Sequence, residues 1–152
     1  MKQAAKQRIS RRRFLGTAAA GLGAPDAVRN MLSNHGLGVL LKSHDGINWM
    51  NRFDRSSTAI GGGEDIHKFA NYFEEAGVPF HAWCVVKGQD PIVEARMCAE
   101  VLSSGARSII FDLEPPEDGQ YWQGSPQTAM IFGSELRRLQ PQAWLSVDPD
   151  TI

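Results

Sequence analysis

Segments typical of β-strands and of α-helices alternate along residues 38–147, and this order restricts the fold more than any other feature of the sequence. Apolar runs of strand length are each followed by a longer segment in which apolar residues recur at helical spacing. The expected strands cover residues 38–42, 78–86, 107–114 and 143–147, and the expected helices cover residues 27–34, 64–76, 91–103 and 126–139. Strands that alternate with helices in this way are parallel, so the pattern predicts an α/β fold.

Local signals mark the ends of the expected helices. Asp90 and Ser125 each precede a proline, which places an N-cap side chain directly before the first helical position. Gly77 and Gly105 follow two of the expected helices, where glycine commonly ends a helix. The strand and helix segments are therefore separated by residues that favour the same boundaries.

A TIM-type (β/α)-barrel fits this order of segments best. A complete barrel has eight strands and typically about 250 residues, whereas this chain has 152 residues. We therefore expect residues 36–152 to form a partial (β/α)-barrel of about four parallel strands, truncated relative to a complete barrel. The unpaired edge strands of such a partial barrel favour self-association.

Residues 1–27 form a basic leader that differs from the rest of the chain. Three consecutive arginines, Arg11 to Arg13, precede a mildly apolar stretch, and this arrangement resembles a bacterial twin-arginine export signal. It predicts export by the twin-arginine machinery to the periplasm or the extracellular space. The alternative is a disordered basic tail that contacts nucleic acid or anionic lipid.

The remainder of the chain is acidic. Of the 16 basic residues, six precede Asp26, so ten basic residues face 17 acidic residues in the rest. This balance disfavours nucleic acid as a partner. No later segment approaches the roughly 18 apolar residues that a membrane span requires, so we expect no stable span. Cys84 and Cys98 are expected to be small buried residues; no zinc-type spacing occurs, and we expect no metal or cofactor.

The strand expected at 107–114 ends in two carboxylates. Alternation places Ser108, Ile110, Asp112 and Glu114 on one face of this strand. Two prolines follow, so the acids lie at the strand's carboxyl end, where α/β folds build active sites. A carboxylate pair of this kind can provide one protonated acid and one ionised partner for cleavage of a glycosidic bond. The structural alternative is that these acids cap neighbouring loops or pair with lysines.

Other polar or aromatic residues are expected at the same edge of the sheet. Parallel strands bring their carboxyl ends together, so we expect four further residues to line the groove: Lys42, Asp45, Trp83 and Asp148. Trp83 would serve as a stacking platform for a sugar ring, although a tryptophan at such a position is more often part of the core. Asp148 precedes a proline, which is also common in turns.

A family resemblance covers residues 36–116. The lysine-bearing segment 38–46, the aromatic segment 81–85 and the Phe111 to Glu114 segment succeed one another as in the glycoside hydrolase family 25 lysozymes, which this part of the chain resembles. The resemblance implies a (β/α)-barrel that acts on cell-wall or related glycans, with Glu114 as proton donor and Asp112 as its partner carboxylate. The family's first strand, with a further aspartate, has no counterpart here.

Three functions follow from these residues. The first is an exported glycoside hydrolase that acts on an amino-sugar polymer or related polysaccharide. The second is a carbohydrate-binding barrel that retains the groove without the chemistry. The third is a metal-dependent hydrolase, whose oxygen and imidazole ligands would come from four residues: His44, Asp112, Glu114 and Asp148.

Overall fold

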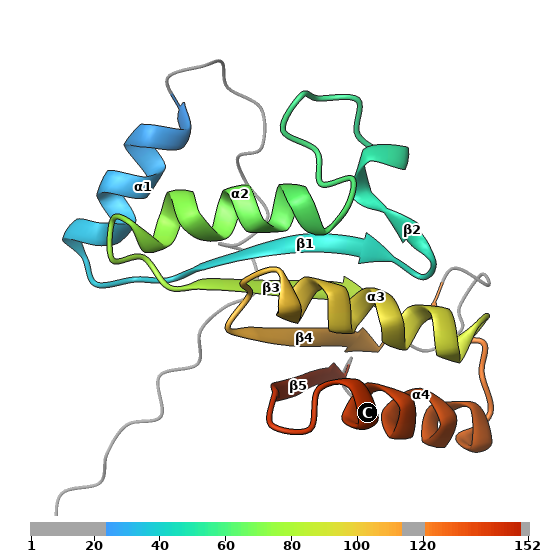
Figure 1. Ribbon diagram of the computed structural model, residues 1–152. Coiled ribbons are helices and arrows are strands. Elements are labelled where there is room, and N and C mark those ends of the chain that lie inside the picture. The colour runs from blue at the N-terminus through green and yellow to red at the C-terminus, as the bar shows by residue number, and fades with distance from the viewer. Residues whose placement is uncertain (1–23, 114–120, 150–152) are drawn as a thin grey trace, which may run out of the picture.

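A five-stranded sheet forms the centre of the protein (Figure 1). The computed structural model describes residues 24–113 and 121–149. Four parallel strands make up most of the sheet: β1 (Val39–Asp45), β3 (Phe80–Val85), β4 (Ser108–Leu113) and β5 (Trp144–Pro149). The short strand β2 (Asn48–Trp49) pairs antiparallel with β1, and the strand order is β2-β1-β3-β4-β5.

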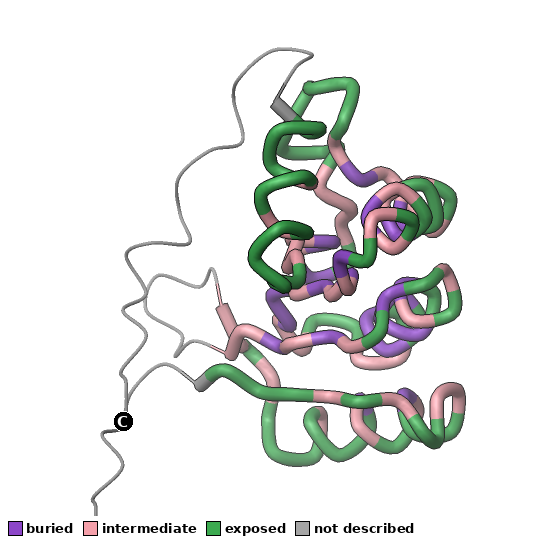
Figure 2. Tube along the Cα trace, turned by 90° about the vertical axis from the view of Figure 1, so that its left-hand side faces the viewer, coloured by how far each residue is buried: buried purple, intermediate pink, exposed green. Residues whose placement is uncertain are grey.

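Three of the helices connect successive parallel strands. These are α2 (Gly63–Glu74), α3 (Pro91–Ser103) and α4 (Pro126–Leu139), and they lie side by side on one face of the sheet (Figures 1 and 2). The first helix, α1 (Ala24–Asn34), packs against α2, where the guanidinium of Arg29 lies 4.2 Å from the centroid of the Tyr72 ring. We call the face of the sheet opposite α2, α3 and α4 the far face.

The core lies between the sheet and these three helices. Strand residues that point toward the helices are buried, and Phe80, Ala82 and Ile109 have no exposed surface. The helices contribute Ile66 and Leu136, which are 0% and 1% exposed. In the end-on view of Figure 2 the buried segments gather between the strands and the helices. Burial of this apolar surface holds the two layers together.

The helix boundaries follow the local signals in the sequence. The side chain of Asp90 accepts a hydrogen bond of 3.1 Å from the backbone N–H of Val93. Ser125 and Thr128 form a reciprocal capping box at the start of α4. The predicted helices at 91–103 and 126–139 are thus confirmed, and the α/β fold with a mostly parallel sheet is confirmed with them.

Strand β2 was not predicted, because it lies between the strand expected at 38–42 and the helix expected at 64–76, where the sequence indicated neither a strand nor a helix. The chain turns tightly at Gly46, so that His44 pairs with Trp49 and Asp45 pairs with Asn48. The 3-10 helix η2 (Met50–Arg52) follows directly. A strand of two residues is too short to show alternation, so its formation depends on the adjacent edge of β1.

Most of the predicted leader lies outside the described residues, and α1 begins at Ala24 rather than at the predicted Ala27. In the part of the chain that the structure describes, no helix combines the length and apolar character needed to cross a lipid bilayer.

Candidate functional site

Two successive rows of residues cross the far face near the carboxyl ends of the parallel strands. Parallel pairing sets each row, because registered residues on neighbouring strands point to the same side. The first row runs through Lys42, Trp83, Ile110 and Ser146. The next row, closer to the strand ends, runs through Asp45, Val85, Asp112 and Asp148. All five of the described residues that were predicted for the site therefore lie in these two rows.

Asp112 and Asp148 are registered partners on β4 and β5. Ile109 and Phe111 are buried toward the helices, which places Asp112 on the far face as the alternation predicted. Neighbouring strands lie about 4.8 Å apart, so two carboxylates project from adjacent positions. Asp112 is half-buried, whereas Asp148 is exposed.

Glu114 lies outside the described residues. It follows Leu113, the last residue of β4, by one position in the sequence. The pairing of Asp112 with Glu114 therefore stays a prediction, and the described part of the site contributes three carboxylates, those of Asp45, Asp112 and Asp148.

Asp45 is held by two lysines. The Nζ atom of Lys42 lies 2.8 Å from Oδ2 of Asp45, and the Nζ atom of Lys87 lies 2.5 Å from Oδ1. Burial opposes ionisation of Asp45, but the hydrogen bonds and positive charges of the two lysines outweigh it and lower the pKa of this carboxyl group. Asp45 is thus an ionised anchor that fixes two ammonium groups at this edge of the sheet.

Trp83 lies in the middle of the far face and is half-buried. The Nζ atom of Lys42 lies 4.9 Å from the centroid of its ring, which is within cation–π distance. An ammonium group therefore occupies one side of the indole. The pair of Lys42 and Trp83 presents an aromatic surface next to a positive charge.

Glu94 was not predicted as a site residue, yet it organises the loop that carries Lys87. This carboxylate is 1% exposed and accepts hydrogen bonds from four consecutive backbone N–H groups, those of residues 87–90. The available signal in the sequence was a glutamate in the first turn of a helix that begins with Asp90-Pro91. Its long reach back to the preceding loop is visible only in three dimensions.

His44 lies on the opposite side of the sheet from the two aspartates. The register shifts between Lys42 and His44: Lys42 pairs with Trp83, and His44 pairs with the very next residue, Cys84. This extra residue on β1 is a β-bulge that turns His44 toward α3, where its Nε2 atom lies 3.6 Å from Sγ of Cys98. The predicted ligand set that combined His44 with Asp112 and Asp148 is therefore wrong, because His44 faces the helices.

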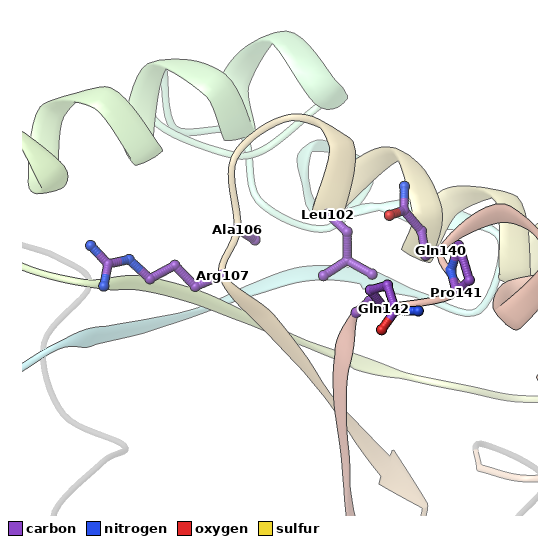
Figure 3. Close-up of a pocket in the computed structure, with 7 residues that line it drawn as sticks. Leu102, Ala106, Arg107, Gln140, Pro141 and Gln142 are labelled. Atoms are coloured by element: carbon purple, nitrogen blue, oxygen red, sulfur yellow. The ribbon is translucent and has the colours of Figure 1, made fainter.

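Two hollows lie away from the far-face rows. The hollow in Figure 3 has a volume of about 310 Å³ and lies where α3 and α4 end and β4 and β5 begin, at the other end of the strands. Among the described residues that line it, Arg107 alone is ionisable, and its guanidinium is paired with Glu74. A second hollow of about 510 Å³, lined by Phe111, Phe132 and Val147 among others, is apolar and lies on the helix side of β4 and β5.

The chain was compared with protein-family models, with curated proteins and with solved structures, and none of the three comparisons gave a match.

Proposed function

We propose that this protein is an exported glycoside hydrolase-like protein whose far face binds an amino-sugar polymer or a related polysaccharide. The observation that carries the proposal is the registered pair Asp112 and Asp148 at the carboxyl end of the far face. Carboxylates at adjacent positions suit the cleavage of a glycosidic bond, which uses one acid as proton donor and a second as base or nucleophile. In this proposal the sheet is part of a (β/α)-barrel.

The roles of the acids follow from their positions. Glu114 would donate the proton to the glycosidic oxygen, as its resemblance to the lysozyme pattern implies. Asp112 would remain ionised beside the developing positive charge on the sugar ring. Asp148 would extend the acidic edge from the neighbouring strand, at the same level as Asp112.

The remaining groove residues suit carbohydrate binding. Trp83 offers an apolar ring on which a sugar can pack, and Lys42 places a hydrogen-bond donor beside it. Asp45 keeps Lys42 and Lys87 at the same edge, where their ammonium groups can donate to hydroxyl or acetamido oxygens. The twin-arginine-type leader supports delivery of the protein to a compartment in which cell-wall glycans are present.

The test is turnover of peptidoglycan or of a soluble amino-sugar oligomer by the full chain, measured as release of new reducing ends. We expect Glu114→Gln to lower the rate by at least about 100-fold, since general acid catalysis contributes roughly 10²–10⁴. Glu75→Gln is the matched control, because Glu75 is an exposed glutamate at the end of α2. Equal rates for wild type and Glu114→Gln would remove the catalytic assignment.

A non-catalytic carbohydrate-binding role is the second candidate. The ion pairs of Asp45 with Lys42 and Lys87 favour this role. These charged side chains pair with one another, so their arrangement is explained without a chemical step at this edge of the sheet. In that case the full chain would bind the oligomer without turnover, and Trp83→Ala would weaken binding while Glu114→Gln would leave it unchanged. Isothermal titration with the oligomer measures these affinities, and the turnover assay distinguishes the two roles.

A further inference from the structure

Three side chains that can bind a metal ion meet in the core, on the helix side of the sheet. They are His44 on β1, Cys84 on β3 and Cys98 on α3. Their ligand atoms all lie within 4.8 Å of one another, and the three residues are at most 1% exposed. They are separated by 40 and 14 positions in the sequence. No short motif joins them, and the fold alone brings them together.

The distances match a shared metal ion. Sγ of Cys98 lies 3.9 Å from Sγ of Cys84 and 3.6 Å from Nε2 of His44. With bonds of about 2.3 Å to sulfur and about 2.0 Å to nitrogen, a tetrahedral ion separates two thiolates by about 3.8 Å and a thiolate from an imidazole nitrogen by about 3.5 Å. The two distances to Cys98 therefore require little movement of these side chains.

The imidazole is held in the tautomer that a metal requires. The hydroxyl of Ser43 donates its single proton to the backbone carbonyl of Trp83 at 3.0 Å, so its oxygen can only accept from Nδ1 of His44, which lies 2.9 Å away. The Nδ1 atom thus carries the proton in the neutral ring, and the lone pair of Nε2 points at Cys98. A hydrogen bond to the other ring nitrogen is the usual way in which proteins orient a metal-binding histidine.

A disulfide between the two cysteines explains this arrangement less well. Oxidation would remove both thiol protons, and the lone pair of Nε2 would then face two sulfur atoms that have nothing to donate. Buried acceptors in proteins are rarely left in this condition. A metal ion instead engages the imidazole and both sulfur atoms at once.

We propose that His44, Cys84 and Cys98 bind a thiophilic metal ion, of the kind represented by Zn²⁺ and Cu⁺, which links β1, β3 and α3. Thiolate ligands select such ions. A divalent ion would balance the two thiolate charges, which favours Zn²⁺ in a dry core. Among the described residues no fourth histidine, cysteine or acid joins the group. This favours Cu⁺, because three ligands can complete its coordination. The proposal is independent of the glycan-binding role of the far face.

The test uses the full chain, unfolded and stripped of metal under reducing conditions and then refolded with Zn²⁺ or, without oxygen, with Cu⁺. Refolding is needed because the ligand atoms are buried. We expect native mass spectrometry to show one ion per chain after refolding with at least one of the two metals. We also expect a rise in Tm of roughly 5–10 °C when free metal exceeds Kd about 100-fold. Refolding with Co²⁺ in place of Zn²⁺ should produce thiolate-to-metal charge-transfer absorption.

Variants separate this site from adventitious binding. Cys98→Ala and Cys84→Ala should each abolish the rise in Tm and the Co²⁺ absorption. Val101→Ala is the matched control, because it shortens another fully buried side chain of α3 without touching the three ligands, and it should keep the response. The proposal is overturned if neither ion binds to the wild type, if the cysteine variants respond like the wild type, or if the natively purified chain contains a Cys84–Cys98 disulfide.

Discussion

The Nζ atom of Lys87 lies 2.5 Å from Oδ1 of Asp45, and this ion pair joins the loop after β3 to the end of β1. Lys42 binds the other carboxylate oxygen of Asp45, so one acid orders two lysines at the edge of the proposed groove. The same loop is held from the opposite side by Glu94, whose carboxylate accepts from its backbone. Two carboxylates thus determine where Lys87 lies.

Asp45→Asn is expected to lower stability at neutral pH by roughly 1–3 kcal/mol, because it removes a charge-assisted hydrogen bond to Lys42 and an ion pair with Lys87. The pKa of Asp45 is lowered in the folded protein, so this acid stabilises the fold above its ordinary pKa of 3.8. That contribution disappears as the pH falls through the lowered folded value, where the acid becomes protonated and resembles asparagine.

Urea unfolding of wild type and Asp45→Asn, from neutral pH to below pH 3.8, measures this difference. The gap between the two proteins should shrink at the acid end of the series. A gap that stays constant with pH would show that the ionised form of Asp45 gains nothing from its two lysines.

Glu94→Gln is expected to destabilise the protein by roughly 2–4 kcal/mol. A buried amide oxygen accepts hydrogen bonds less strongly than a carboxylate oxygen. The amide NH₂ group would also face the backbone N–H groups of the loop, and two donors cannot bond to each other. The exposed Glu75→Gln serves as control and should change stability by less than about 0.5 kcal/mol. Denaturant unfolding measures both values. Similar values for the two variants would mean that the loop at residues 87–90 is held by other contacts.

Gly105→Ala is expected to be more harmful than Gly77→Ala, although both residues have a positive φ, 120° and 71° respectively. A Cβ at Gly77 meets nothing within 4 Å, so this substitution should cost only the left-handed conformation, about 1–2 kcal/mol. A Cβ at Gly105 would lie 2.8 Å from Cβ of Ala70 on α2, which adds an overpacking cost of about 1–3 kcal/mol.

A double-mutant cycle checks the source of the additional cost at Gly105. Ala70→Gly removes the clashing atom, so the combined variant should lose less stability than the sum of the single variants, by about 1 kcal/mol or more. Strict additivity would show that the contact between these positions is not the cause.

Local patterns in the sequence were sufficient for the order of the four parallel strands and the four α-helices, and for the face on which Asp112 lies. Alternation along β4 depends only on the geometry of an extended chain, so buried Ile109 and Phe111 specify where Asp112 points. The caps at Asp90 and Ser125 act within one helical turn, and they were predicted for the same reason. The register that brings Asp148 beside Asp112 agrees with the expected convergence of parallel strands.

Tertiary structure decided the features that depend on contacts between distant segments. The bulge between Lys42 and His44 arises from the pairing of β1 with β3, and it reverses the side that simple alternation assigns to His44. No repeating pattern or characteristic spacing in the sequence indicates that Glu94 contacts the preceding loop. The same holds for the meeting of His44 with Cys84 and Cys98. Alternation and capping are properties of the local backbone, whereas strand register and side-chain meetings in the core are set only when the whole sheet and its helices pack together.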